Sequence, residues 1–154
     1  MVPWSPLGAG ILTGKYRRGS DADRNRPVAG TGDGRLSAAN PLTNTRFDHR
    51  TWSIVETLVD LAQEIGASPA EVALAWLIGR PTVTAPILGV RTAGQLDAAF
   101  GALKLSLERP SIERLQLATS PTLTYPATLF GDAAPRVSRA KPRILNWQQQ
   151  VFCP

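Results

Sequence analysis

The sequence predicts an α/β fold in which two short parallel strands are joined by a long, largely helical connection. Its apolar start ends at Trp4 and Ser5 and leads into a glycine-studded turn, which is typical of a strand that delivers a ligand-binding loop. A short β-branched run over 83–88 predicts a second buried strand, and two segments with helical spacing lie between the two. Strands separated by such a crossover are expected to be parallel. Since a parallel pair needs further strands and covering helices, we expect part of a larger sheet.

Length and composition are compatible with one domain, or part of one. The chain has 154 residues, of which 43% are hydrophobic, enough for a single core. Its net charge of +5 is unevenly spread, because four of the 17 Lys and Arg residues lie in the last 22 residues, which contain no acidic residue. The rest of the chain is nearly neutral. We divide the chain into a folded part over 1–126 and an irregular basic tail over 127–154, at the point where the resemblance given below ends.

The tail predicts little beyond its charge. Its four basic residues interleave with prolines and lack an aromatic platform, so we expect a disordered end rather than nucleic-acid binding. An altered reading frame would explain the abrupt change of character equally well. The only cysteine, Cys153, lies in this tail and has no partner for a disulfide or a metal site.

The expected location is the cytoplasm. No segment approaches the ~20 apolar residues of a membrane span, and the start lacks the charged and apolar regions of a secretory signal.

The elements follow in order from local patterns. Residues 17–45 are rich in turn formers and have no apolar period, which predicts a long loop of the kind used as a lid. From Trp52 to Ile65 apolar residues recur every three or four positions, which predicts a helix that Gly66 ends.

A second helix is predicted to begin at Ser68, because the sequence SPAE supplies an N-cap, a proline in the first turn and a glutamate that can reach back. The run VALAWLIG is apolar nearly all round, so this helix should be largely buried, and Pro81 prevents its continuation.

The second strand leads into a third helix. Pro86 indicates that the strand over 83–88 is an imperfect ladder member. The sequence TAGQ at 92–95 repeats the capping-box pattern, and helical spacing continues to Leu103. A shorter helix follows Pro110, and the pattern dissolves from Ser120 onward.

Each strand-to-helix junction offers groups that could bind an anion. At the first, Trp4 could stack on a flat ring, Ser5 and the amides around Leu7 and Gly8 could hold a pyrophosphate, and Lys15 could screen its charge. The alternative is a core tryptophan followed by a flexible loop.

At the second junction, Gly89 allows close approach to the backbone, and the helix start at Thr92 presents free amides. Arg91 could pair with a phosphate through two hydrogen bonds, or could be a solvated surface residue. Both junctions lie at carboxyl ends of parallel strands, where α/β folds bind their ligands. A dinucleotide with a 2′-phosphate would use all of these groups.

Three stretches closely resemble the C-terminal half of the aldo-keto reductases: PWSPLGAGILTGKY, W..IVETL..LA.EIG.SPAEVALAWL and PILGVRTAGQLDAAFGAL. The resemblance runs from about Val2 to Pro126. It implies the C-terminal portion of a (β/α)8 TIM barrel, an incomplete barrel with two core strands, the seventh and eighth, and about four helices. It also implies NADPH as cofactor and a small carbonyl compound as substrate of the full-length enzyme.

The resemblance assigns roles to individual residues. Trp4 would stack on the nicotinamide, while the pyrophosphate would be lined by Ser5, Leu7 and Gly8 and covered by Lys15. Arg35 matches an arginine of the loop that closes over the cofactor. The segment around the adenosine 2′-phosphate is matched by Gly89, Arg91 and Gln95.

The sequence departs from the family in two respects. An acidic or amide pair that usually contacts the adenine is replaced by Ala98 and Ala99, so adenine contacts should be weakened. The family's Asp, Tyr, Lys and His tetrad lies in the first half of the barrel and has no counterpart here. We assign no catalytic residue and no metal site, because His49, Tyr16 and Tyr125 lack the partners of a general acid.

The predicted function is therefore the NADP(H)-binding part of an aldo-keto reductase, an enzyme that transfers hydride between NADPH and a carbonyl compound. This chain by itself is expected to be inactive, because the tetrad is absent. The alternative is a noncatalytic module that binds a nucleotide or associates with a complementary half-barrel or with itself, because exposed strand edges favour association.

Overall fold

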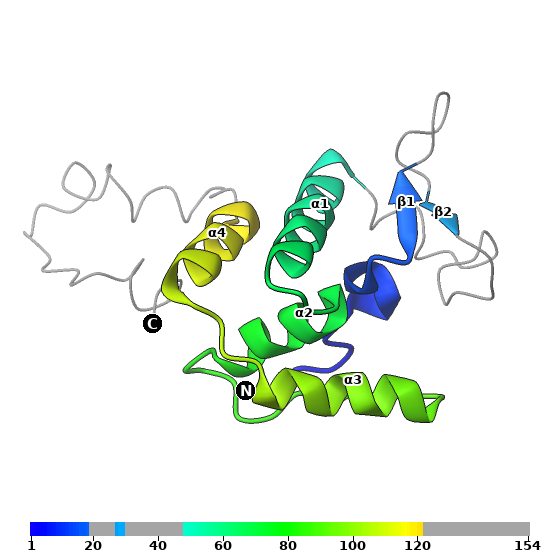
Figure 1. Cartoon of the computed structure of the whole chain (residues 1–154), viewed down its shortest axis with the longest axis vertical. Coiled ribbons are helices and arrows are strands. Elements are labelled where there is room, and N and C mark those ends of the chain that lie inside the picture. The colour runs from blue at the N-terminus through cyan, green and yellow to red at the C-terminus, as the bar shows by residue number, and fades with distance from the viewer. Residues whose placement is uncertain (19–26, 30–47, 122–154) are drawn as a thin grey trace, which may run out of the picture. The chain divides into compact units, whose positions relative to one another are not determined.

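The computed structural model describes residues 1–18, 27–29 and 48–121 (Figure 1). The chain divides into two units, Met1–Ala118 and Thr119–Pro154. The elements of the first unit, the last of which ends one residue beyond it, are η1 (Gly8–Thr13), β1 (Tyr16–Arg18), β2 (Pro27–Ala29), α1 (His49–Glu64), α2 (Pro69–Ile78), α3 (Ala93–Lys104) and α4 (Arg109–Thr119). The predicted tail over 127–154 lies outside the described residues.

The two predicted core strands lie side by side and run parallel, but they pair at a single bridge, between Trp4 and Ile87. The Ile87 amide donates to the Pro3 carbonyl at 2.8 Å, and the Thr84 amide donates to the Met1 carbonyl at the same distance. Regular strands do not form here because Pro3 and Pro86 have no amide hydrogen to donate to a ladder. The two segments thus run parallel as predicted, but the two regular strands that we predicted do not form.

The long loop predicted over 17–45 also differs from the structure. Tyr16–Arg18 and Pro27–Ala29 pair as antiparallel strands, with Arg17 opposite Val28. Strands of three residues are too short to produce a readable alternation of apolar and polar positions, which is why the sequence pattern missed them. The rest of this segment lies outside the described residues.

The first two helices begin and end where local signals predict. Asp48 caps α1 by accepting a hydrogen bond from the Thr51 amide at 2.6 Å, which lowers the pKa of the Asp48 carboxyl. Gly66 follows α1 in the left-handed conformation, with φ of 69°. At α2 the capping box is complete, because Ser68 Oγ accepts from the Glu71 amide and the Glu71 carboxylate accepts from the Ser68 amide.

The core is built on α1, which contributes to both clusters of buried side chains. One joins Trp52 and Val55 of α1 to Ile11 and Tyr16. The other joins α1 and α2 to α4, through Leu58, Leu61, Ala62, Val72, Ala73 and Leu115. Among the residues that the structure describes, Trp52 and Val72 are the largest side chains that are completely enclosed.

The helix α2 lies between α1 and α3 and contacts both (Figure 1). The expectation that α2 is largely buried holds for Val72, Ala73 and Leu74, whereas Ile78 is exposed at the end of the helix. Gly101 of α3 allows the close approach of α2, because a Cβ at this position would overlap the Glu71 carboxylate. No helix among the described residues is long and apolar enough to cross a membrane.

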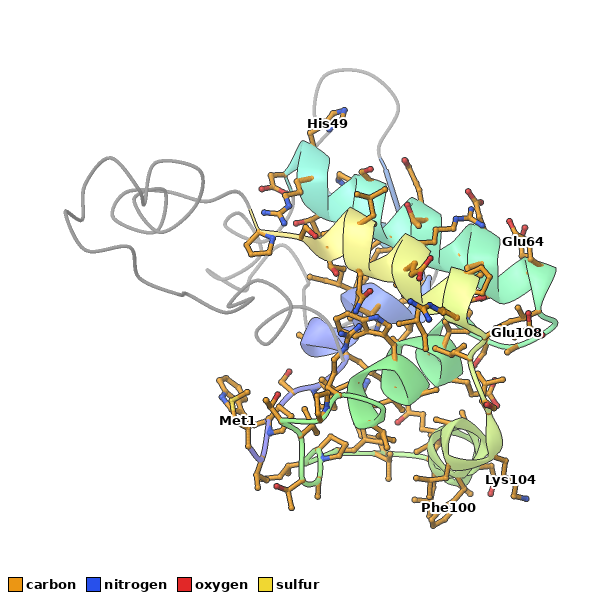
Figure 2. All side chains as sticks on the ribbon, turned by 90° about the vertical axis from the view of Figure 1, so that its left-hand side faces the viewer. Met1, His49, Glu64, Phe100, Lys104 and Glu108 are labelled. Carbon is orange, nitrogen blue, oxygen red and sulfur yellow. The ribbon has the colours of Figure 1, made fainter. Side chains whose placement is uncertain are left out.

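One side of α3 is apolar and uncovered. Leu96, Phe100 and Leu103 are spaced by four and three residues and are between 42% and 65% exposed. Figure 2 shows Phe100 on the outer side of α3. An ion pair joins α4 to the last residue of α1. Arg114 of α4 lies 2.7 Å from the carboxylate of Glu64, which raises the pKa of the arginine.

Replacing Gly14 with alanine is expected to lower the free energy of unfolding by about 1.5 kcal/mol, since Gly14 has φ of 73° and the left-handed conformation costs an L-residue about 1 kcal/mol. The remainder comes from contact, because the new Cβ would lie 3.2 Å from Pro69 Cγ and 3.3 Å from Val59 Cγ2. Urea unfolding followed by circular dichroism measures the loss.

Gly66→Ala is the matched control for this substitution. Gly66 has φ of 69°, and no atom lies within 4 Å of a Cβ built there. The control should therefore cost only the backbone strain of about 1 kcal/mol. Equal losses in the two variants would contradict the close packing of Gly14 against α1 and α2.

The capping box of α2 predicts a dependence of stability on pH. Hydrogen bonds from the Ser68 hydroxyl and the Ser68 amide lower the pKa of Glu71 below its ordinary value of 4.5. A carboxyl with a lowered folded-state pKa contributes stability above its unfolded pKa, and this contribution is lost as the pH falls through the folded pKa.

Glu71→Gln should therefore be less stable than the unaltered chain at pH 7, by about 0.5–1 kcal/mol, and the difference should shrink as the pH falls from 7 to 3. Urea unfolding at the two pH values tests this. A difference that persists unchanged at pH 3 would contradict a charged cap, and Glu56→Gln on α1 serves as the control.

Candidate functional site

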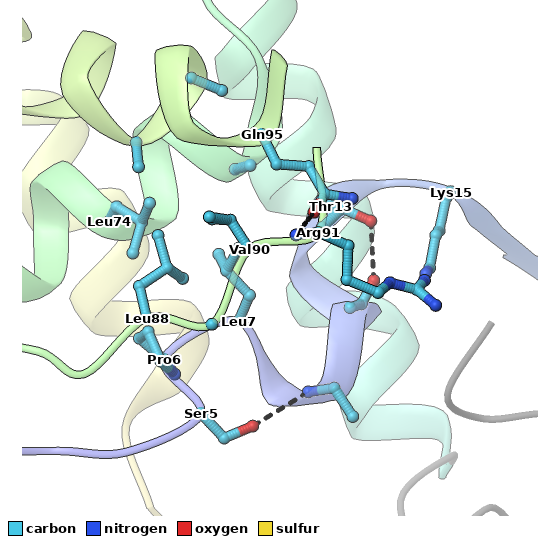
Figure 3. Close-up of a pocket in the computed structure, with 16 residues that line it drawn as sticks. Ser5, Pro6, Leu7, Thr13, Lys15, Leu74, Leu88, Val90, Arg91 and Gln95 are labelled. Carbon is cyan, nitrogen blue, oxygen red and sulfur yellow. Dashed lines mark hydrogen bonds between the residues drawn. The ribbon is translucent and has the colours of Figure 1, made fainter. Parts of the chain in front are cut away.

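A cavity of about 170 Å³ lies where the two strand-to-helix junctions meet (Figure 3). The loop after Trp4 forms one part of its wall, the segment before α3 forms another, and α2 and α3 complete it. Its lining residues are Ser5, Pro6, Leu7, Ala9, Gly10, Thr13, Lys15, Ala70, Leu74, Leu88, Gly89, Val90, Arg91, Gln95, Ala98 and Ala99.

The first loop is held in an unusual backbone conformation. Ser5 and Ala9 have positive φ angles, 51° and 59°, although neither is glycine, and Gly8 and Gly10 are also left-handed. Such backbone strain occurs where the surrounding structure imposes it, and it is concentrated at ligand-binding sites. Here the Ser5 hydroxyl accepts a hydrogen bond from the Ala9 amide at 3.3 Å, which ties the two strained residues together.

Several amides of this loop are already used within it. The Gly8 amide donates to the Ser5 carbonyl and the Gly10 amide to the Leu7 carbonyl, both at 2.9 Å. The Thr13 hydroxyl donates to the Gly10 carbonyl at 2.8 Å. These bonds give the loop a fixed shape, and they commit the Gly8 amide, which we expected to face a pyrophosphate, to the loop itself.

Lys15 closes the end of the loop. Its Nζ lies 4.9 Å from the centre of the Tyr16 ring, a distance at which the ring face attracts a cation. A Cβ at Gly10 would approach Lys15 Cε and Nζ to 2.8 and 2.9 Å, so a larger residue there would displace the lysine from this part of the loop.

The second junction is built around the start of α3. Thr92 caps the helix by accepting a hydrogen bond from the Gln95 amide at 3.3 Å. The Gln95 side chain does not return to Thr92 as a full capping box would require. Its Oε1 accepts from the Arg91 amide at 2.8 Å, one residue earlier. This bond fixes the backbone of Arg91 and leaves the guanidinium at the cavity (Figure 3).

The cavity thus has two different sides. Arg91 and Lys15 lie on one side, and Leu74 and Leu88 lie on the other (Figure 3). The strained loop and the start of α3 flank the cationic side. Such a cavity favours a ligand with an anionic group at one end and an apolar or flat group at the other.

Most of the predicted site residues meet at this cavity. Six of them line it, namely Ser5, Leu7, Lys15, Gly89, Arg91 and Gln95. Trp4 and Gly8 do not line it, and Trp4 is 77% exposed. Arg35 lies outside the described residues. Among the described residues no group of His, Cys, Asp or Glu could hold a metal ion.

Sequence reasoning missed the contribution of α2. Ala70 and Leu74 line the cavity, four residues apart on one side of that helix. The apolar pattern of α2 runs nearly all round, so it gave no indication of which side would meet the loop. Thr13 was also missed, although it lies inside the glycine-studded stretch. A hydroxyl in such a stretch can bond to the backbone and hold the loop in shape, as Thr13 does with the Gly10 carbonyl.

Comparison with known proteins places these observations in a family. The model of the aldo/keto reductase family matches residues 1–119. The chain is 34% identical over 115 residues to an uncharacterized oxidoreductase, YrpG, of Bacillus subtilis, a match that covers 75% of this chain and 30% of that protein. The resemblance identified from the sequence is confirmed.

Two further relatives extend the comparison. The protein tas of Escherichia coli is 32% identical over 130 residues, which cover 82% of this chain and 34% of tas. A probable voltage-gated potassium channel subunit beta of rice is 35% identical over 105 residues, or 67% of this chain and 29% of the subunit. The chain therefore spans about a third of the length of these relatives.

Proposed function

We propose, since this chain belongs to the aldo/keto reductase family, that it forms the NADP(H)-binding part of an oxidoreductase that transfers hydride between NADPH and a carbonyl compound. The family has a (β/α)8 fold, and we propose that residues 1–126 form its C-terminal portion. The observation that carries the proposal is the cavity, because residues from both strand-to-helix junctions line it.

The residues at this cavity fit a phosphorylated dinucleotide. Arg91 and Lys15 supply positive charge for phosphates, and Arg91 has the planar donor arrangement that pairs with a phosphate through two hydrogen bonds. The strained Ser5 and Ala9 are the kind of backbone feature that persists at ligand sites. The volume of about 170 Å³ is smaller than a typical pocket for a whole ligand of drug size, so it suits one end of the dinucleotide.

Each residue has a proposed task. Arg91, Gly89 and Gln95 would hold the 2′-phosphate end. Ser5 and Leu7 would line the pyrophosphate, with Lys15 above it, while Gly8, whose amide donates to the Ser5 carbonyl, would shape the loop. Trp4 is 77% exposed beside the bridge to Ile87, which leaves its ring available to stack on the nicotinamide, the group that supplies the hydride.

Binding of NADPH is the direct test. Isothermal titration calorimetry of the purified chain with NADPH and with NADH compares two ligands that differ only in the 2′-phosphate. We expect NADPH to bind at least about tenfold more tightly, because Arg91 can form charged hydrogen bonds only with that phosphate. If neither dinucleotide binds, the proposal fails.

Carbonyl reduction by this chain alone is not expected. The family's proton donor and its partners have no counterpart in the sequence, so a bound carbonyl would lack a general acid. Absorbance at the NADPH band in the presence of 4-nitrobenzaldehyde should not fall faster than for Trp4→Ala. Turnover above that control would overturn the assignment of no catalytic residue.

A second candidate function is assembly with a polypeptide that carries the remaining β/α units of a barrel. The uncovered side of α3 and the exposed Trp4 and Ile87, which are 77% and 59% exposed, favour it. We choose this partner because the family has a (β/α)8 fold and this chain spans about a third of the length of its relatives.

Co-expression tests this candidate. The partner is a tagged segment of Bacillus subtilis YrpG that comprises the part not matched by this chain. We expect co-purification in a one-to-one ratio, and we expect Phe100→Asp, on the uncovered side of α3, to reduce it. Recovery of the chain as a monomer without its partner would contradict assembly.

A further inference from the structure

Different parts of the fold supply the polar and the apolar side chains that line the cavity. The side chains with charge or hydrogen-bonding groups come from the first loop, from the segment that leads into α3 and from the first turn of α3, which carries Gln95. In contrast, α2 and the second turn of α3 contribute apolar side chains only, namely Ala70, Leu74, Ala98 and Ala99. A ligand group that lies against these two helices meets methyl and methylene groups.

Several polar side-chain atoms of the two junctions take part in hydrogen bonds within the chain. Gln95 Oε1 accepts from the Arg91 amide, and Thr92 Oγ1 accepts from the Gln95 amide. On the loop side, the Thr13 hydroxyl donates to the Gly10 carbonyl, and the Ser5 hydroxyl accepts from the Ala9 amide. The charged groups at the cavity are Arg91 and Lys15, which recognise phosphate and not the edge of a ring. The Gln95 amide nitrogen and the Ser5 hydroxyl can still donate, but a donor by itself can bond to the ring nitrogens N3 and N7, which adenine and hypoxanthine share.

We infer that this cavity selects its dinucleotide by the phosphate and not by the base. The inference rests on the proposed NADP(H) binding and goes beyond it, because it predicts that bases other than adenine are accepted. Distinguishing one purine from another requires paired donors and acceptors at the ring edge, and the second turn of α3 presents none, since Ala98 and Ala99 face the cavity there.

The probe is the pair NADPH and reduced nicotinamide hypoxanthine dinucleotide phosphate, in which the adenine amino group is replaced by a carbonyl oxygen and N1 gains a hydrogen. Calorimetric titration of the unaltered chain should give dissociation constants within about threefold of each other. A preference for NADPH of tenfold or more would overturn the inference and leave the proposed function intact. If neither ligand binds, the proposed function fails and the inference fails with it.

A substitution in the apolar wall provides the converse test. Asparagine forms a two-bond pair with adenine, so Ala99→Asn should create a preference for NADPH over the hypoxanthine form of about fivefold. Ala93→Asn is the matched control, because Ala93 is exposed on the same helix and does not line the cavity. It should leave the two ligands within about twofold.

The variants are compared at equal helix content, measured by circular dichroism. Ala98 and Ala99 are only half-buried, so an asparagine there can be accommodated without breaking the core. Equal binding of the two dinucleotides to a folded Ala99→Asn variant would show that the base does not lie against α3, and the inference would be overturned.

Discussion

Replacing Trp52 with alanine is expected to lower the free energy of unfolding by about 3–5 kcal/mol, the largest effect of any single substitution considered for this chain. Trp52 is 2% exposed and packs with Val55, Ile11 and Tyr16. Removing its ring would leave a cavity between α1 and the segment that forms the first loop of the site. Since domains are stable by only about 5–15 kcal/mol, a large fraction of the folded state would be lost.

The matched control is Trp4→Ala, which removes the same side chain from an exposed position. Trp4 is 77% exposed, so its loss should cost less than about 1 kcal/mol. Urea unfolding followed by circular dichroism compares the two, with Trp52→Phe as the variant that stays measurable if the alanine variant does not fold. Similar losses for Trp52→Phe and Trp4→Ala would contradict the enclosed position of Trp52.

The parts of the fold that the sequence predicted are those specified within a few residues. The start of α2 depends on Ser68 and Glu71, which are three positions apart and bond to each other. The end of α1 depends on Gly66, whose left-handed φ favours glycine. Such signals are complete in the local sequence, so no knowledge of tertiary packing was needed.

The parts that could not be predicted depend on contacts between distant segments. The parallel direction of the first and second strand segments followed from the length of the crossover, but their pairing at one bridge depends on which amides meet across the pair. The antiparallel pair of β1 and β2 is too short to leave a pattern. Both failures arise because hydrogen bonding between strands is decided by neighbours in space.

The candidate site shows the same division. Arg91 was found because it lies at a helix start, where capping residues and anion-binding groups coincide, whereas Gln95 was assigned to the site by the resemblance to the family. Ala70 and Leu74 were missed because an evenly apolar helix does not indicate which of its sides faces a loop. The redirection of Gln95 toward Arg91 was also unpredictable, since both partners are within its reach.

Replacing Arg91 with glutamine is expected to weaken NADPH binding by about 30-fold, which corresponds to ~2 kcal/mol. The loss has its origin in the guanidinium, whose charged hydrogen bonds to a phosphate glutamine cannot reproduce. The fold should be unaffected, because it is the Arg91 amide, retained in the variant, that donates to Gln95 Oε1 at 2.8 Å. Calorimetric titration with NADPH measures the change.

Two comparisons separate this effect from a general loss of positive charge. Arg109→Gln removes the same charge from α4, where Arg109 pairs with Glu113 at 2.9 Å and does not line the cavity, so NADPH binding should change by less than about twofold. NADH, which lacks the 2′-phosphate, should bind Arg91→Gln and the unaltered chain equally. An equal loss of affinity for both dinucleotides would mean that Arg91 acts on a part they share, and the assignment of Arg91 to the 2′-phosphate would have to be withdrawn.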